Sequence, residues 1–358
     1  MFVITIKMLL KSIKLINYRN HVKYDIDFDN ITVLVGKNGV GKSNIIEAIY
    51  LMGFAKSFRT NNDEVLINYD TAYAQILAET NIGHYNFVLQ KQDGKVKKQI
   101  AIDKIKSNLV NLVGGLKMVL FDPKSLDIII GPPGNRRKYM DMLISQIDKK
   151  YLKVLIKYKK ILRAKNELLK KISHREALVK ELHFWNKEFI KNAKIIMHKR
   201  MDFVNYLSDN ISDYYKEIAL DKNIKFDVKY NFSCKNIDDF ENVVEKIKNK
   251  EIMYEKTLIG PHLDDIKILI DDKNAYDVCS RGEIRTIALA LKIAEIKYLK
   301  AKSDSNKILL LLDDIFSELD IFRRDQIIKI IKDYQAVIST TDENFIKKNM
   351  GKIKIIKL

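Results

Sequence analysis

The sequence predicts an α/β fold in which mixed sheets are flanked by helices and an α-helical arm is inserted between two halves. Three features of the 358-residue chain lead to this prediction. A glycine-rich loop follows a buried-strand pattern near the N-terminus, and a second apolar strand, ending in two aspartates, lies near the C-terminus. Between them runs a lysine-rich segment with the heptad spacing of paired helices.

Both ends of the chain show the sequence patterns of an α/β fold. Residues 8–36 are predicted to form a strand pair, whose second strand is the β-branched run 31–36. A helix pattern follows at 44–54, and Asp93-Gly94 is typical of a hairpin turn. The C-terminal half contributes further predicted strands at 308–312 and 336–338.

The middle of the chain is strongly basic. Residues 146–200 contain 17 Lys and Arg against 5 Asp and Glu, a net charge of +12. Apolar residues recur there in two series separated by a break at 172–174, which predicts two packed helices. The series are Tyr151, Leu155, Tyr158, Leu162 and Leu169, then Leu178, Leu182, Trp185, Phe189, Ile196 and Phe203. The lysines are consistent with a polyanion-binding surface and equally with a solvated face.

The composition narrows the class of protein. The net charge of +18 favours a polyanionic partner, meaning nucleic acid or an acidic membrane surface, although an AT-rich genome that favours lysine codons is an alternative cause. Cys234 and Cys279 lack metal-ligand spacing, and so small a number of cysteines favours a reducing compartment, and with it a cytoplasmic protein, over a disulfide scaffold. No stretch approaches the roughly 20 apolar residues of a spanning helix, so membrane association is not predicted.

The glycine-rich loop fits the phosphate-binding pattern G-x-x-x-x-G-K-[ST]. Its residues are Gly36, Lys37, Asn38, Gly39, Val40, Gly41, Lys42 and Ser43. The glycines let backbone N–H groups close around phosphate oxygens at a helix N-terminus. The pattern predicts ATP as ligand, with Lys42 reaching the β and γ phosphates and Ser43 binding Mg²⁺. A chance glycine-rich turn is the alternative.

Two further motifs complete the predicted site. Asp313 and Asp314 end an apolar strand, where Asp313 could hold Mg²⁺ and Asp314 could orient or deprotonate the attacking water. Adjacent buried carboxylates repel one another unless a cation is present. Ser280 and Gly282 precede a helix predicted at 284–299 and form either a second phosphate-binding device or an ordinary helix cap.

These motifs together resemble the RecF family of bacterial DNA repair proteins, relatives of SMC and ABC-type ATPase heads. The resemblance covers most of the chain. Beyond the phosphate-binding loop it is carried by EAIYLMGFAKSFRT at 47–60, FDPKSLDIIIGPPGNRRKYMD at 121–141, TLIGPHLDD at 257–265, CSRGEIRTIALALK at 279–292, and the aspartates and SELD at 313–320. The chain departs from the family pattern at Leu263, Glu283 and Ile284.

The resemblance implies an ABC-type ATPase head with the arm inserted in a second lobe. The implied boundaries are 1–135 for the N-terminal part of the ATPase lobe, 136–220 for the arm, and 221–358 for the remainder. Residues 280–282 would be the ABC signature that meets the nucleotide of a second subunit. Asp320 would lie in the D-loop, and Thr341 would stand in place of the switch histidine.

The resemblance also implies a function. ATP would drive homodimerisation of a clamp on single- and double-stranded DNA, with slow DNA-stimulated hydrolysis. The clamp would act in the nucleoid beside RecR, and indirectly RecO, to assist RecA loading at gaps, in DNA replication, repair and the SOS response. Alternatives are a nucleotide-binding subunit of a transporter and a DNA scaffold that uses ATP structurally. Family chains open much like the segment from Met8, so residues 1–7 are expected to be an extension or an upstream start.

Overall fold

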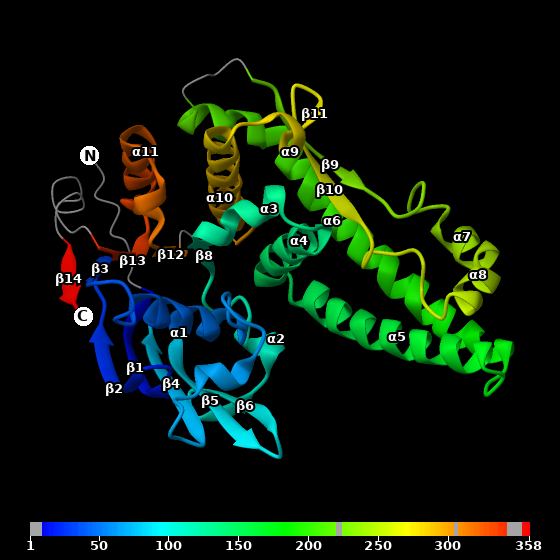
Figure 1. The fold of residues 1–358 in the computed structure, drawn as a ribbon, viewed down its shortest axis with the longest axis horizontal. Helices are drawn as coiled ribbons and strands as arrows, with labels where there is room; N and C mark the ends of the chain where they lie inside the picture. The colour runs from blue at the N-terminus through cyan, green and yellow to red at the C-terminus, as the bar shows by residue number, and fades with distance from the viewer. Residues whose placement is uncertain (1–8, 220–223, 304–306, 342–352) are drawn as a thin grey trace. The chain divides into compact units, whose positions relative to one another are not determined.

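The computed structural model describes residues 9–219, 224–303, 307–341 and 353–358 (Figure 1). The expected N-terminal extension, 1–7, lies outside the described residues. The chain divides into two compact units. The first unit joins both chain ends, Met1–Ser125 and Glu295–Leu358, and the second is Leu126–Ala294.

A parallel sheet forms the centre of the first unit. Its strands stand in the order β14-β3-β13-β12-β8 and every neighbouring pair is parallel. Their bounds are β3 Ile31–Val35, β8 Met118–Phe121, β12 Leu309–Asp313, β13 Gln335–Thr340 and β14 Lys354–Lys357. All residues of β8, β12 and β13 are buried, as expected for parallel strands covered on both faces. Both predicted C-terminal strands are confirmed.

A separate antiparallel sheet accounts for the alternating sequences between 10 and 107. Its order is β2-β1-β4-β5-β6-β7. The bounds are β1 Leu10–Tyr18, β2 His21–Asp27, β4 Tyr73–Thr80, β5 Gly83–Gln92, β6 Lys95–Ile102 and β7 Ile105–Ser107. The predicted turn at Asp93-Gly94 is confirmed, because both residues have positive φ between β5 and β6.

The prediction of two strands within 8–36 was wrong, because the segment holds three. The missed strand is β2, His21–Asp27, which pairs with β1 at an edge of the sheet. Only two of its seven residues are buried, so the apolar pattern that reveals a strand is nearly absent.

Helix α1, Lys42–Phe54, lies between the two sheets (Figure 1). It packs against β12 and β13 on one side, and Tyr18 at the end of β1 donates a hydrogen bond to its Glu47. Eleven of its thirteen residues are buried, which explains why the segment is apolar almost all round. Short helices α2, Leu109–Leu112, and η1, Asp63–Leu66, complete this part of the unit.

The second unit is dominated by two long helices. These are α5, Lys149–Ser173, and α6, Leu182–Ile218, which pack along one another as predicted. The predicted break at 172–174 is confirmed as the end of α5. The remaining elements include α3 Asp127–Ile130, α4 Pro133–Ile147, α7 Phe240–Lys246, α8 Lys248–Met253, α9 Ala275–Val278, and the sheet β9 Phe226–Asn231, β10 Asp265–Ile270 and β11 Lys273–Asn274. Helix α10, Arg281–Ser303, starts in this unit.

Buried charges hold the two sequence motifs of this unit together. The Arg136 guanidinium donates through Nε and Nη2 to the two carboxylate oxygens of Asp265, at 2.7 and 2.9 Å. Arg137 donates to the Asp264 carbonyl oxygen. Arg200, 3% exposed, pairs with Asp141. Bidentate arginine–carboxylate pairs are strong and geometrically specific. They therefore explain why 121–141 and 257–265 carry paired arginines and aspartates.

Burial of His262 gives the second unit an acid-sensitive position. Burial lowers the pKa of His262 to about 4, and its Nδ1 accepts a hydrogen bond from the Tyr158 hydroxyl at 2.7 Å. The unfolded value is near 6.5, so the unfolded chain binds more protons between pH 6.5 and 4. The contribution of neutral His262 to stability is therefore present above pH 6.5 and is lost as the pH falls towards 4.

We expect His262 to contribute about 3 kcal/mol to the loss of unfolding free energy between pH 7 and 4. Urea unfolding at both pH values measures this loss. The wild type should lose more stability than His262→Gln, whose side chain does not titrate. His198→Gln, at an exposed position on α6, is the control. Equal losses in wild type and His262→Gln would assign the acid sensitivity elsewhere.

Among the described residues, no helix is long and apolar enough to cross a bilayer.

Candidate functional site

The candidate site lies at the carboxyl ends of three parallel strands. The glycine-rich loop follows β3, Asp313 ends β12, and Ser339 lies near the end of β13. Asp313 and Ser339 are direct partners in the β12–β13 register. Ligands of open parallel sheets bind at this edge, because the loops leaving the strands meet there.

The loop adopts backbone angles that require glycine. Gly39 has φ +88° and Gly41 has φ +114°, in the left-handed region where a side chain is strained. A Cβ on Gly41 would also lie 2.7 Å from the His21 ring. Helix α1 begins directly after Gly41, so its N-terminal N–H groups point towards the loop.

A cavity of about 200 Å³ opens at this helix N-terminus. It is lined by Asn38, Gly39, Gly41, Lys42, Ser43, Asn44, Arg59 and Asp314. Lys42 is 7% exposed, and its ammonium donates to the carbonyl oxygens of Gly36 and Lys37 at 2.6 and 3.0 Å. The cavity thus combines backbone N–H groups with two cationic side chains, which suits a polyphosphate.

The serine of the loop meets the aspartate of β12 across 270 residues of sequence. The Ser43 hydroxyl donates to Oδ1 of Asp313 at 2.8 Å, and the Ser339 hydroxyl donates to the same oxygen at 2.7 Å. Asp313 is 7% exposed. Hydroxyl and carboxylate oxygens are hard donors of the kind that Mg²⁺ takes alongside water and phosphate oxygens. The donor set therefore fits Mg²⁺.

Asp314 lies beside this pair and lines the cavity. Its φ of 51° places it in the left-handed region, and its backbone N–H donates to the Ser339 hydroxyl at 2.9 Å. The unusual backbone turns the chain sharply after β12. Consecutive strand residues normally alternate between faces, so this turn is what brings Asp314 to the cavity beside Asp313.

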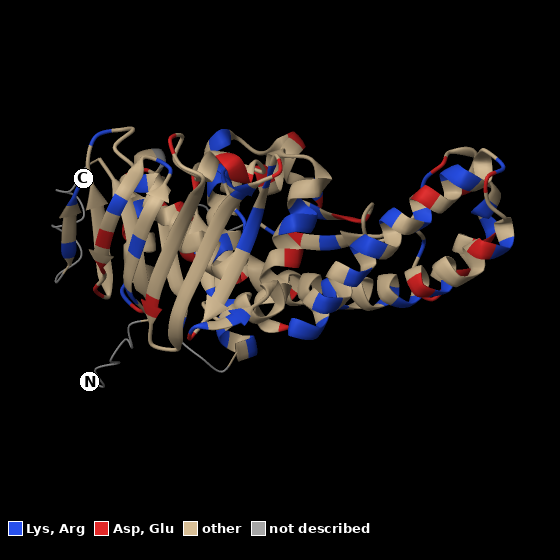
Figure 2. Ribbon diagram, turned by 90° about the horizontal axis from the view of Figure 1, so that it is seen from below, with Lys and Arg blue, Asp and Glu red and all other residues tan. Residues whose placement is uncertain are grey.

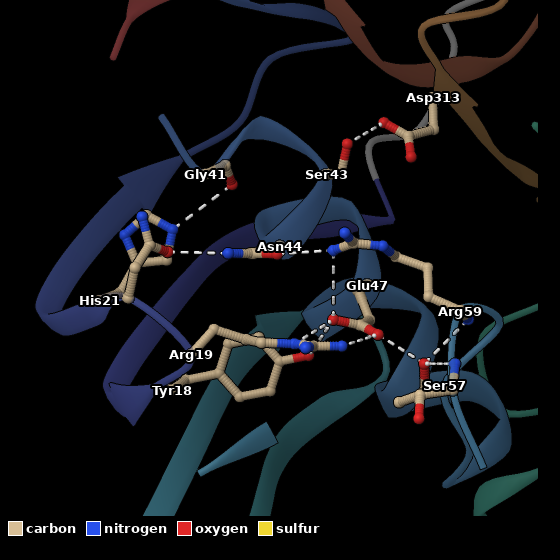
Figure 3. A network of polar contacts seen from close by, with 12 residues as sticks. Tyr18, Arg19, His21, Gly41, Ser43, Asn44, Glu47, Ser57, Arg59 and Asp313 are labelled. Carbon is tan, nitrogen blue, oxygen red and sulfur yellow. Dashed lines mark hydrogen bonds and ion pairs between the residues drawn. The ribbon is translucent and has the colours of Figure 1, made fainter. Parts of the chain in front are cut away.

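Sequence reasoning missed Arg59, a second cation at the cavity. Arg59 follows α1, and its guanidinium donates to Oδ1 of Asn44 at 2.6 Å and lies 3.8 Å from Glu47 (Figure 3). The backbone N–H of Arg59 also donates to the Ser57 hydroxyl. The arginine lies within the segment 47–60 that resembles the RecF family, and that position was the available signal.

Glu47 organises the neighbours of Arg59 (Figure 3). This carboxylate is fully buried and accepts from Nη2 and Nε of Arg19 at 2.7 and 2.8 Å, and from the hydroxyls of Tyr18 and Ser57. Burial, followed by the charge of Glu47, raises the pKa of Tyr18 well above its usual value, so the phenol remains a donor. A buried carboxylate that accepts from this many donors holds the donor side chains in fixed positions.

Ser280 forms a helix cap in the second unit. Its hydroxyl accepts from the Glu283 N–H at 3.3 Å, and the Glu283 carboxylate accepts from the Ser280 N–H at 2.7 Å. This reciprocal pair is a capping box, and it explains in structural terms why a glutamate stands at position 283. The helix begins at Arg281 rather than at the predicted residue 284.

The remaining predicted site residues lie at strand and helix ends of the first unit. Thr341 is exposed directly after β13. Asp320 caps α11, Ile321–Ile331, by accepting from the Arg323 N–H at 2.9 Å. No cluster of three or more His, Cys, Asp or Glu side chains suitable for a metal occurs among the described residues.

Comparisons with known proteins match this arrangement over nearly the whole chain. The RecF/RecN/SMC N-terminal domain family matches residues 9–357. The DNA replication and repair protein RecF of Agathobacter rectalis is 36% identical over 347 residues, covering 95% of this chain and 94% of that protein. RecF of Lachnospira eligens is 34% identical and covers 98% of both chains.

Solved structures of related proteins have the same fold as this chain. The recombination mediator protein RecF-ATPrS in the RecFOR pathway matches with a TM-score of 0.88 and 29% identity, over 99% of this chain and 97% of that one. The Smc head domain of Pyrococcus furiosus matches with a TM-score of 0.55 at 18% identity, over 96% and 92% of the two chains, which shows a shared fold. The predicted fold class is therefore confirmed, and the chain belongs to the RecF family within the RecF/RecN/SMC N-terminal domain group.

Proposed function

We propose that this protein is an ATP-dependent, DNA-binding repair ATPase that dimerises as a clamp when it binds ATP. The observation that carries the proposal is the 2.8 Å contact between Ser43 and Asp313 at the edge of the cationic cavity. Two related solved structures are described as the recombination mediator protein RecF in the RecFOR pathway, one as RecF-ATP and one as RecF-ATPrS. Those descriptions support ATP as ligand and DNA repair as the process.

The roles of the site residues follow from their positions. Residues 36–43 would surround the phosphates with backbone N–H groups, and Lys42 would exchange its carbonyl partners for the β and γ phosphates. Ser43 and Asp313 would hold Mg²⁺, which neutralises phosphate charge when it is bound. Asp314 would orient the attacking water or accept its proton.

Other groups would complete the site. Arg59, which lines the cavity, would contact the outer phosphates, because a guanidinium group can donate two parallel hydrogen bonds to phosphate oxygens. Thr341 would take the place of a switch residue beside the water, and Asp320 would lie near the dimer partner.

The basic arm supports DNA as the partner. Figure 2 shows Lys and Arg recurring along its helices. On α5, a helix of 3.6 residues per turn, the spacing of five exposed basic residues places them on one face about 33 Å long. They are Lys149, Lys153, Lys160, Arg163 and Lys171, and none makes an ion pair with a described residue. Glu167 is exposed on the same face between Arg163 and Lys171, so this row of five cations and one anion has a net charge of +4, which suits a phosphate backbone.

Reversing two arm charges should weaken DNA binding without regard to sequence. In Lys153→Glu/Lys160→Glu, the slope of log affinity against log salt on duplex DNA should flatten by about 0.9 for each lost phosphate contact. Fluorescence anisotropy at several salt concentrations measures it. The matched control is Lys329→Glu/Lys332→Glu, in the last turn of α11 and at its C-cap, with the same change in charge at exposed positions. If DNA affinity and the salt slope change equally in both variants, the arm lysines are only a solvated face and do not contact DNA.

Dimerisation is proposed from the position of Ser280 and the resemblance to ABC heads. Ser280, Arg281 and Gly282 would reach the nucleotide held by the other subunit, so that two identical chains enclose two ATP molecules symmetrically. ATP would then have higher affinity for the dimer than for the monomer, which is the requirement for a switch.

Ser280→Arg should bind ATP nearly normally as a monomer but neither dimerise nor hydrolyse it. The larger side chain would block the approach of the second subunit, while the loop at 36–43 is unchanged. Sedimentation velocity with ATP measures dimerisation. Glu283→Ala is the control, because it breaks the same capping box at a cost of about 1 kcal/mol but leaves Ser280 in place. ATP-dependent dimers of Ser280→Arg would show that the serine is only a cap.

The wider role is proposed from the family. The protein would act in the cytoplasm at the nucleoid, beside RecR and indirectly RecO, to assist RecA loading at single-strand gaps in replication, repair and the SOS response. Phosphate release with and without gapped DNA tests the core of the proposal. Mg²⁺-dependent turnover that DNA increases supports it, and ATP binding without any turnover would favour a scaffold that uses ATP structurally.

A further inference from the structure

A second basic surface lies on the first unit, far along the sequence from the arm. The segment 91–106 contains six lysines against Asp93 and Asp103. It spans the end of β5, all of β6 and the start of β7. This segment is not part of the nucleotide cavity or of the arm, and the proposed function leaves its charges unexplained.

Strand alternation places these lysines on two different faces. Side chains of β6 point alternately to opposite faces of the sheet, and its exposure alternates accordingly. Lys95 and Lys97 are exposed on the outer face, and Lys106 joins them because it pairs with Ala101 of the same face. These three residues, here called the hairpin lysines, make no ion pair with a described residue.

The outer face around the hairpin lysines is suited to a phosphate backbone. It carries the amide side chains of Gln90, which is opposite Lys97, and of Gln99. Of the carboxylates on this face, Glu79 and Asp25 are paired with Lys11 and Lys14, and Asp27 lies on β2, at the opposite edge of the sheet from β6 and β7. Lysines and side-chain amides are among the groups that contact DNA phosphates without reading sequence.

Lys98, on the inner face of the same strand, connects this surface to the nucleotide cavity. Its ammonium donates to the Ala55 carbonyl at 2.9 Å and pairs with Asp63 at 2.6 Å. Ala55 and Asp63 are the two ends of the segment 55–63, here called the bridging segment. That segment carries Arg59, which lines the cavity.

We propose that the outer face of β6 is a second DNA-backbone contact and that Lys98 transmits its occupancy through the bridging segment to Arg59. The proposal rests on the function proposed above and deepens it, because it assigns the DNA stimulation of ATP turnover to named residues. DNA held on the outer face restrains β6, and Lys98 then restrains both ends of the bridging segment. Arg59 consequently spends more time in the position that faces the phosphates.

Four variants distinguish the DNA contact of β6 from the transmission through Lys98. Lys95→Glu/Lys97→Glu should lower DNA affinity and reduce the salt slope by about 1 for each lysine, with turnover in the absence of DNA unchanged. Lys98→Met should keep DNA affinity and basal turnover but lose most of the stimulation by saturating DNA. Lys98→Arg should restore stimulation, because it retains a charged donor for the Asp63 carboxylate. Asp63→Asn should resemble Lys98→Met.

The measurements are DNA anisotropy and phosphate release with and without saturating duplex DNA, with Lys329→Glu/Lys332→Glu as the charge-matched control. If Lys95→Glu/Lys97→Glu has unchanged DNA affinity and an unchanged salt slope, the outer face of β6 does not contact DNA. If Lys98→Met loses basal and DNA-stimulated ATP turnover equally, or if Lys98→Arg does not restore the stimulation, Lys98 has only a structural role. Either result contradicts the proposed transmission from β6 to Arg59. If the wild type neither binds DNA nor turns over ATP, the proposed function itself fails, which is a different result.

Discussion

Asp314→Asn should bind ATP with wild-type affinity and hydrolyse it about 10²–10⁴-fold more slowly. The substitution leaves the loop, Lys42 and the Ser43–Asp313 contact in place, because the phosphate-binding groups come from other residues. It removes the carboxylate that would accept a proton from the attacking water. The amide also fits the left-handed backbone at this position, since asparagine tolerates positive φ.

ATP affinity by equilibrium titration and turnover by phosphate release measure the two effects separately. ATP-bound dimers of this variant should also persist longer, because their nucleotide is not consumed. Asp313→Asn is the informative comparison. It is expected to weaken Mg²⁺ dependence as well as turnover, since Asp313 rather than Asp314 accepts from Ser43. Wild-type turnover in Asp314→Asn would assign the general base to another group.

Lys42→Met should abolish measurable ATP binding and, with it, every ATP-dependent effect on DNA. Methionine has a similar length but cannot form charge-assisted hydrogen bonds to phosphate oxygens. It also leaves the carbonyl oxygens of Gly36 and Lys37 without their ammonium donor. The loss therefore combines a missing phosphate contact with a less ordered loop.

The control for this variant is Lys332→Met, which removes the same charge at an exposed position in the same unit. Thermal unfolding of both variants shows whether the fold is retained. Lys42→Arg is the more demanding test, because it keeps the charge but changes its geometry. Unchanged ATP affinity in Lys42→Met would contradict the assignment of the loop.

Local patterns were sufficient to predict most elements and the loop. The β-branched run before Gly36, the apolar run before Asp313 and the heptads of the arm all became the expected strands and helices. The edge strand β2 escaped prediction because it buries little. Local patterns alone could not show that Ser280 and Glu283 form a reciprocal cap, although the spacing S-x-x-E permits one.

By itself, the sequence determined the chemistry available to this protein: a phosphate-binding loop, a carboxylate pair after a buried strand, and a basic pair of helices. These depend on neighbours within a few residues, where periodicity and glycine content are informative. Only the tertiary structure decided which distant groups meet. Parallel register set Ser339 opposite Asp313, and the segment after α1 returned Arg59 to the cavity. Such meetings depend on how strands pair and helices pack, and no local spacing records them.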